Sequence, residues 1–176
     1  MVRTVAVIGA GAAGRAFALR CAGAGFAVAL EDVMPEKLRR AQDDYSSLAG
    51  EGSLRVATTV EDAVHDADLA IDFVPDELES KLEIFSLLDR MAPPRTILCT
   101  PTQTLSITDL ASCTYRPEIC VGLRSGNLIA GPVEVLRSRF ASAAALESVA
   151  AMLARLGLAS SVVDDTEPML VKNLAL

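Results

Sequence analysis

Short apolar runs alternate with amphipathic, helix-like segments along most of this chain. The runs of strand length fall at Thr4–Ile8, Ala27–Leu30, Arg55–Ala57, Leu69–Val74, Thr96–Cys99, Ile119–Leu123, Val133–Leu136 and Ala159–Val163. Helical patterns occupy Ala12–Ala24, Pro35 to about Leu48, Val60–His65, Glu77–Met91, Ala141–Leu156 and Met169–Leu174, and Ser106 is placed to cap a further short helix. Strands that alternate with helices form βαβ units with parallel strands. The pattern predicts an α/β fold, a doubly wound, mostly parallel sheet of the Rossmann type, in a single domain spanning 1–176.

Composition and charge narrow the roles open to such a domain. The 176 residues are 51% hydrophobic, which is enough for one packed core. The net charge of -7 disfavours a nucleic-acid partner, because a phosphate backbone is bound by a basic face. No apolar run approaches the roughly 20 residues of a membrane span, and no signal peptide precedes the first strand. We therefore expect a cytoplasmic protein with no membrane partner.

The cysteines and the single histidine are not expected to hold a metal. The four cysteines lack CxxC spacing, and His65 offers them no metal-binding partner. Cys21 and Cys99 fall within apolar helix or strand patterns, which favours buried free thiols. His65 lies in EDAVHDADL, where we expect a solvated side chain near a helix end.

A glycine-rich loop between the first strand and the first helix predicts dinucleotide binding. The segment GAGAAG has the pattern GxGxxG at Gly9, Gly11 and Gly14. The first glycine permits a tight turn, the second lets the backbone approach a pyrophosphate, and the third lets helix and strand pack closely. We expect the phosphates to bind at the helix N-terminus, against the residues of the loop: Gly9, Ala10, Gly11, Ala12, Ala13 and Gly14.

A carboxylate at the end of the second strand indicates which dinucleotide is bound. Asp32 follows Glu31 at the distance from the loop expected of an acid that accepts the ribose hydroxyls. We prefer Asp32 because it closes the strand, where a side chain can point into the crevice. Its charge repels the additional phosphate of NADP, and Val33-Met34 supplies no arginine to receive one. The predicted cofactor is NAD.

Several segments together resemble the NAD-binding domain of the L-3-hydroxyacyl-CoA dehydrogenase family. They are VAVIGAGAAG, DADLAIDFVPDELESK, TLSITDLA followed by RPEICVGL, GPVEV and VVDDTEPMLVKNL, in this order over nearly the whole chain. The resemblance implies hydride transfer between NAD and the 3-position of an acyl thioester, with a place in fatty acid metabolism. It also implies a helical domain for substrate binding and dimerisation, which we expect to lie outside 1–176.

The resemblance extends the expected cofactor site beyond the glycine loop. Val74, Pro75 and Asp76 follow the fourth strand, where the family contacts the nicotinamide side of the cofactor. Lys81 falls on the family's lysine five residues later, and Gln103 in PTQTL is assigned to the cofactor site as well. From the residues alone, Lys81 is expected to be a solvated charge of its helix.

The resemblance also shows where the family's acid–base residues are replaced. It implies a histidine general acid/base, oriented by a glutamate and assisted by a serine and an asparagine. Arg124 stands at the histidine position in GLRSGNL, Gln103 at the serine position, and Lys172 at the asparagine position, with Asn173 one step off register. A guanidinium remains protonated and cannot shuttle a proton. The remaining catalytic candidates are Glu134, which is retained in PVEV, and Lys172, whose pKa would have to be lowered by burial.

Basic residues outside these segments are few. Lys37, Arg39 and Arg40 form a cluster after the second strand, where the family has a longer helical excursion that helps to hold CoA. A solvated helix face is the favoured interpretation of this cluster.

Two functions remain open. The first is a divergent NAD-dependent oxidoreductase, acting on a 3-hydroxyacyl thioester or a related hydroxy acid, with Arg124 and Lys172 as a possible cationic pocket for an acidic small molecule. The second is a non-catalytic NAD(H)-binding sensor or regulatory subunit, favoured by the replaced acid–base residues. A piece of a longer enzyme is a further interpretation of the same residues. A homodimer or a complex with a partner subunit is expected in either case.

Overall fold

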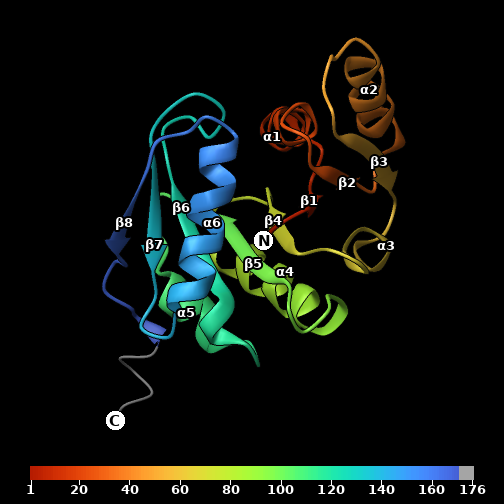
Figure 1. The fold of residues 1–176 in the computed structure, drawn as a ribbon. Coiled ribbons are helices and arrows are strands. Elements are labelled where there is room, and N and C mark those ends of the chain that lie inside the picture. Colours follow the sequence, from red (N-terminus) through yellow and green to blue (C-terminus); the bar gives the residue numbers. More distant parts are fainter. Residues whose placement is uncertain (171–176) are drawn as a thin grey trace.

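The fold is that of a computed structural model, in which residues 1–170 are described. Its strands are β1 (Thr4–Ile8), β2 (Ala27–Glu31), β3 (Ser53–Ala57), β4 (Leu69–Asp72), β5 (Ile97–Pro101), β6 (Cys120–Arg124), β7 (Val133–Arg137) and β8 (Ser160–Asp164). Its helices are α1 (Ala12–Gly23), α2 (Pro35–Ser46), α3 (Val60–Val64), α4 (Leu78–Met91), α5 (Ile107–Ser112), the 3₁₀ turn η1 (Pro117–Ile119) and α6 (Ala143–Arg155). Strands and helices alternate through most of the chain (Figure 1), as the apolar pattern predicts.

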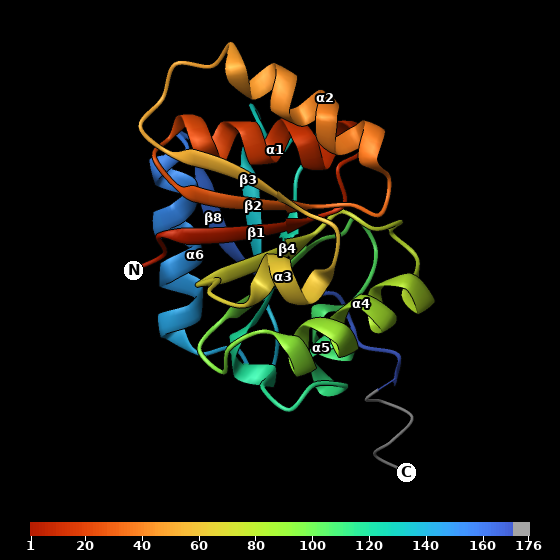
Figure 2. The same ribbon diagram turned by 90° about the vertical axis from the view of Figure 1, so that its right-hand side faces the viewer.

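The described strands form one twisted sheet in the order β3-β2-β1-β4-β5-β6-β7-β8. All neighbouring pairs are parallel except β6 and β7, which are antiparallel. Helices α1 and α2 lie on one side of the sheet, and α4 and α5 lie on the other (Figure 2). The doubly wound, mostly parallel sheet in one domain is therefore confirmed.

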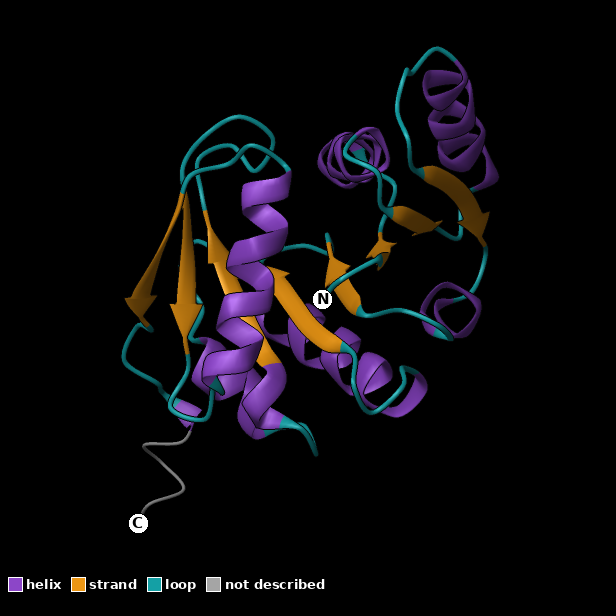
Figure 3. Cartoon of the chain, in the orientation of Figure 1, coloured by secondary structure: helices purple, strands orange, loops and turns teal. Residues whose placement is uncertain are grey.

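Helices cover both faces of the sheet (Figure 3). Two apolar cores fill the space between the sheet and these helices, one on each face. Phe17 of α1 and Val149 of α6 belong to the first core, whereas Phe85 and Leu88 of α4 belong to the second. Successive strand side chains point to opposite faces, so the continuous apolar runs of the central strands supply both cores. This double burial explains why those runs do not alternate with polar residues.

The predicted boundaries that fall within the described residues agree with the structure to within two residues. The fourth strand ends at Asp72 rather than Val74, because the chain leaves the sheet toward Pro75. The third strand begins two residues earlier than predicted, at Ser53. Ser106 caps α5 by accepting the N–H of Asp109 at 3.2 Å, as predicted. The helix predicted over Met169–Leu174 lies almost wholly outside the described residues.

The strand order places a crevice at the carboxyl edge of the sheet. The chain passes from β1 to β2 and β3 on one side, and it returns to β4 on the other side of β1. The loops after β1 and β4 therefore diverge toward opposite faces, and a ligand can bind between them. The glycine loop is the loop after β1, so it lies at this crevice.

Within residues 1–170, no helix is long and apolar enough to cross a membrane. The same part of the chain contains no group of three or more His, Cys, Asp or Glu side chains placed to hold a metal ion.

We predict that Phe85→Ala destabilises the protein by about 3–5 kcal/mol, because it leaves a cavity in the second core. Phe85 is fully buried on α4. Met91→Ala, at the exposed end of the same helix, is the control and should cost less than about 1 kcal/mol. Urea unfolding followed by circular dichroism measures both, and equal costs would contradict the assignment of this helix face to the core.

Candidate functional site

The glycine loop forms a tight turn between β1 and α1. Gly9 has a φ of 100°, a backbone conformation that residues other than glycine rarely adopt. Its N–H donates to the Glu31 carbonyl at 2.8 Å. A Cβ at Gly14 would lie 1.9 Å from the Gly9 carbonyl oxygen, so only glycine allows this approach of helix and strand. A Cβ at Gly11 would meet no described heavy atom within 4 Å. The space above Gly11 fits the predicted approach of a pyrophosphate.

Asp32 is tied directly to the glycine loop. Its carboxylate accepts the N–H of Ala10 and the N–H of Met34, each at 2.9 Å. Burial acts to raise the pKa of Asp32, but these hydrogen bonds and the nearby Lys37 ammonium outweigh it, so the pKa lies below its usual value. Asp32 is therefore an anion beside the loop, which is the state needed to accept hydroxyl hydrogens.

Lys37 is a neighbour of Asp32 that the sequence analysis did not identify. Its Nζ lies 3.5 Å from the Asp32 carboxylate, and its side chain is partly exposed. The first turn of α2 brings the two together, because Pro35 starts the helix three residues after Asp32. Arg39 and Arg40 are exposed, as predicted for a solvated helix face. Lys37 is less exposed than these two and lies beside Asp32.

Residues predicted from separate segments meet at a second part of the crevice. A cavity of about 250 Å³ is lined by Ala13, Phe73, Val74, Asp76, Lys81, Pro101, Thr102 and Gln103. The Asp76 carboxylate accepts the backbone N–H of Gln103 at 2.8 Å, which ties the loop after β4 to the loop after β5. The structure thus brings the end of the glycine loop, the residues after β4 and Gln103 to one cavity.

Lys81 is not the solvated charge that its local sequence indicates. It is 1% exposed, and its Nζ donates to Asp72 Oδ1 at 2.8 Å, where the carboxyl group is fully buried. Burial raises the pKa of Asp72, and the Lys81 ammonium opposes this rise. The pair connects α4 to the end of β4 at the wall of the cavity.

Arg124 and Glu134 face each other across the antiparallel strands β6 and β7. Their Cα atoms are register partners, and Arg124 Nη1 lies 3.4 Å from Glu134 Oε2. Both residues line a cavity of about 540 Å³ together with Gln103, Ser125, Gly126, Pro132, Val133, Ala159, Ser160 and Ser161. Gln103 borders both cavities, and its side-chain amide donates to the Ser125 carbonyl at 2.8 Å. The Arg124 cavity therefore lies beside the cofactor-side cavity.

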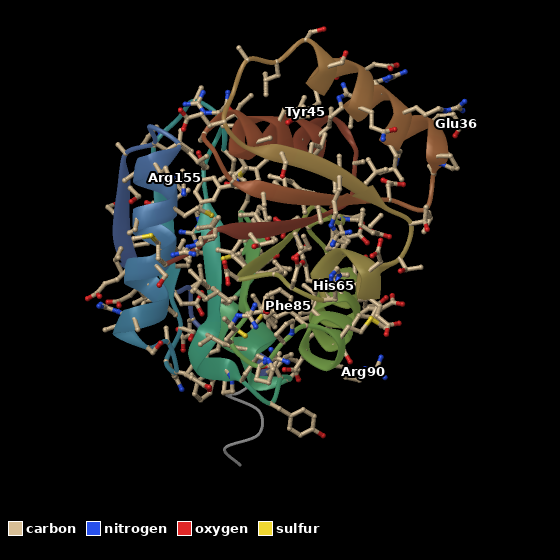
Figure 4. The ribbon with its side chains drawn as sticks, turned by 45° about the vertical axis from the view of Figure 1, so that its right-hand side comes forward. Glu36, Tyr45, His65, Phe85, Arg90 and Arg155 are labelled. Carbon is tan, nitrogen blue, oxygen red and sulfur yellow. The ribbon has the colours of Figure 1, made fainter. Side chains whose placement is uncertain are left out.

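The other candidates fall outside these cavities. His65 ends α3 on the surface, where Figure 4 labels it, and its side chain is 58% exposed. It contacts the carbonyl of Asp62 and takes no part in either cavity, as expected. Cys21 and Cys99 are buried free thiols, and burial raises the pKa of each. Lys172 and Asn173 lie outside the described residues.

Known proteins are similar to this chain in both sequence and fold. Residues 4–166 match the family described as 3-hydroxyacyl-CoA dehydrogenase, NAD binding domain. A probable 3-hydroxybutyryl-CoA dehydrogenase of Bacillus subtilis is 32% identical over 99% of this chain and 67% of its own length. The 5-formyl-3-hydroxy-2-methylpyridine 4-carboxylate 5-dehydrogenase of Mesorhizobium japonicum is 29% identical over the whole chain and 62% of its own length. The two relatives are named as dehydrogenases, and the matching family is described as an NAD-binding domain.

Solved structures support the same relationship. The crystal structure of a 5-formyl-3-hydroxy-2-methylpyridine 4-carboxylic acid 5-dehydrogenase, an NAD⁺-dependent dismutase, superposes with a TM-score of 0.83 at 26% identity. The superposition includes 99% of this chain and 62% of the dismutase chain. The chain thus spans about two thirds, or somewhat less, of the length of these relatives. The cofactor of this chain is NAD.

We predict that Gly14→Ala and Gly11→Ala separate stability from cofactor binding. Gly14→Ala should lower the free energy of unfolding by about 1–3 kcal/mol, because the new methyl group overlaps the Gly9 carbonyl. Gly11→Ala should leave stability within about 0.5 kcal/mol, but it should weaken NADH binding by filling the space for the pyrophosphate. Urea unfolding and calorimetric titration with NADH measure the two effects. Equal loss of stability in both variants would contradict the geometry of the loop.

We further predict that Asp32→Ala weakens NADH binding about tenfold or more, the loss expected for a charge-assisted hydrogen bond. Asp44→Ala is the matched control, because it removes an equal charge from the far end of α2, where Asp44 pairs with Arg15. Calorimetry should show unchanged affinity for the control. Unchanged affinity for Asp32→Ala would overturn the assignment of the ribose-binding carboxylate.

Proposed function

The chain belongs to the family of 3-hydroxyacyl-CoA dehydrogenase NAD-binding domains, and from this premise we propose that it is the nucleotide-binding part of a divergent NAD-dependent oxidoreductase. The convergence of three separate segments on one cavity carries the proposal: Ala13 from the glycine loop, Asp76 from the loop after β4, and Gln103 from the loop after β5. NAD, when bound, supplies hydride donor and acceptor chemistry. The residues of the chain bind and orient the cofactor.

Each part of the crevice has a separate task in this proposal. The open backbone at Gly11 receives the pyrophosphate, and the ionised Asp32 accepts the ribose hydroxyls. The cavity between Val74, Asp76 and Gln103 holds the nicotinamide side. The buried Lys81–Asp72 pair holds the wall of that cavity in place.

We propose a hydroxyacyl thioester or a related hydroxy acid as the substrate class. The Bacillus subtilis relative is named for 3-hydroxybutyryl-CoA, and the Mesorhizobium japonicum relative is named for a pyridine carboxylate. Because the relatives are longer, we propose that substrate contacts also come from a helical region elsewhere in the protein or from a partner subunit, in a homodimer or a mixed complex. A cytoplasmic location and a role in fatty acid metabolism belong to the same proposal.

Arg124 supports a second candidate function. A guanidinium keeps its proton at any physiological pH, so it cannot exchange one with a substrate hydroxyl. In the described structure, Arg124 and Glu134 are the two ionisable residues that line the larger cavity. A module that binds NAD(H) without turnover, as a redox sensor or a regulatory subunit, is the alternative that this pair favours.

We predict that this chain alone does not oxidise 3-hydroxybutyryl-CoA with NAD at ordinary enzymatic rates, which are about 1–1000 per second. The reason is the lack of a proton acceptor at Arg124. Absorbance of NADH at saturating substrate measures the rate, and calorimetry with NADH confirms that the cofactor binds. Turnover within that range would contradict the argument from Arg124.

The variant Arg124→His distinguishes the two candidate functions. An imidazole titrates near neutral pH and restores a proton acceptor beside Glu134. Activity gained by this variant supports the oxidoreductase, because the remaining site must then already hold the substrate. No gain, with NADH binding intact, favours the sensor or regulatory subunit.

A further inference from the structure

The guanidinium of Arg124 is only partly satisfied by its surroundings. Nη1 faces Glu134 at 3.4 Å, a distance longer than a well-formed charged hydrogen bond. Nε and Nη2 are buried and have no hydrogen-bond partner among the described residues. A buried charged donor without a partner is costly, and in native proteins such groups usually have a water, an ion or a ligand.

The two free donors belong to the same edge of the guanidinium. The N–H of Nε and one N–H of Nη2 point in parallel, and this edge matches the two oxygens of a carboxylate. Glu134 does not use this edge, because its contact is with Nη1. The Arg124 side chain is 26% exposed and borders the cavity, and because Nε and Nη2 are buried, a ligand reaches this edge only when the guanidinium turns toward the cavity.

The cavity beside Arg124 is suited to a small polar ligand. Its volume is about 540 Å³, and its lining includes the polar residues Gln103, Ser125, Ser160 and Ser161. Arg124 and Glu134 carry the only formal charges of this lining, and they cancel. A singly charged anion on the free edge lies close to the Arg124 cation, with Glu134 on another nitrogen of the same guanidinium. A phosphate dianion brings a second negative charge, and the lining has no further cation to balance it.

We propose that Arg124 is the receptor for the carboxylate of a small acid bound beside the cofactor. The inference rests on the proposed function, since Gln103 joins this cavity to the one assigned to the nicotinamide side. Of the two substrate classes proposed above, hydroxyacyl thioesters and hydroxy acids, this favours small hydroxy acids and the oxo acids formed from them. A thioester offers one carbonyl acceptor, which leaves half of the guanidinium edge unpaired.

The test is a titration of the protein, saturated with NADH, with butyrate and with butyramide. Butyramide has nearly the same shape without the charge. The Arg124 Nε–H signal in ¹H–¹⁵N NMR spectra, assigned by its loss in Arg124→Lys, should shift saturably with butyrate and should not shift with butyramide. Equal shifts with both probes, or tighter binding of inorganic phosphate than of butyrate, overturns the proposal.

Four variants sharpen the result. Arg124→Gln should weaken butyrate binding at least tenfold, and Arg124→Lys should weaken it less, because the charge remains and the paired edge is lost. Arg90→Gln is the matched control for net charge. It lies at the exposed end of α4 (Figure 4) and should have no effect. Glu134→Gln should tighten butyrate binding several-fold, because it removes a carboxylate that competes for the same guanidinium.

The opposite directions of Arg124→Gln and Glu134→Gln separate ligand binding from a structural role. If Arg124 and Glu134 only join β6 to β7, both variants lower stability and neither tightens butyrate binding, which overturns the proposal. NADH affinity, measured in each variant, keeps the two proposals distinct. Absence of butyrate binding with normal NADH affinity refutes the carboxylate receptor alone, whereas absence of NADH binding refutes the proposed function.

Discussion

Two hydrogen bonds between the glycine loop and the end of β2 determine where a cofactor can bind. The Gly9 N–H donates to the Glu31 carbonyl, and the Ala10 N–H donates to the Asp32 carboxylate. They use backbone donors that would otherwise be unpaired at a tight turn, and they place an anion directly beside the start of α1. The close approach of Gly14 to Gly9 then sets the position of α1 against β1 and β4. The other residues of the crevice lie around this contact between the glycine loop and the end of β2.

The strands, the doubly wound sheet and the glycine loop could be predicted from the sequence because their signals are local. Buried parallel strands give continuous apolar runs, and the loop has a fixed spacing of glycines. Lys81 was harder to interpret, because its neighbours in LESKLEIF are charged. Yet Lys81 lies on the stripe of Ile84, Phe85 and Leu88, at helical spacings of three and four, and this stripe faces the sheet. The signal for its burial was present, together with a partner, Asp72, as the one charged residue of β4.

Contacts that depend on tertiary register were not accessible from the sequence. Arg124 and Glu134 meet because β6 and β7 pair antiparallel, in a register that the residues alone do not determine, although the family resemblance implies that these two positions are neighbours. Lys37 meets Asp32 only after the first turn of α2 is in place. The contact of Gln103 with the Ser125 carbonyl, which links the two cavities, joins loops 22 residues apart. Site residues that belong to a sequence motif can be predicted from the sequence. The charged neighbours that shift the pKa of these residues can be identified only from the three-dimensional structure.

The two cation–carboxylate pairs of the crevice differ in a way that assigns them different roles. The pair of Lys81 and Asp72 is short and almost fully buried, so breaking it would leave an uncompensated charge inside the protein. The pair of Arg124 and Glu134 is longer, half-exposed on the carboxylate side, and leaves two donors of the guanidinium unused. Although Asp72 Oδ2 has no hydrogen-bond partner among the described residues, the Lys81 ammonium is almost fully buried and is held at 2.8 Å by Asp72 Oδ1, so the pair acts as a rigid wall. A loosely paired cation beside a cavity retains binding capacity, and this difference makes Arg124, rather than Lys81, the residue through which the site selects its ligand.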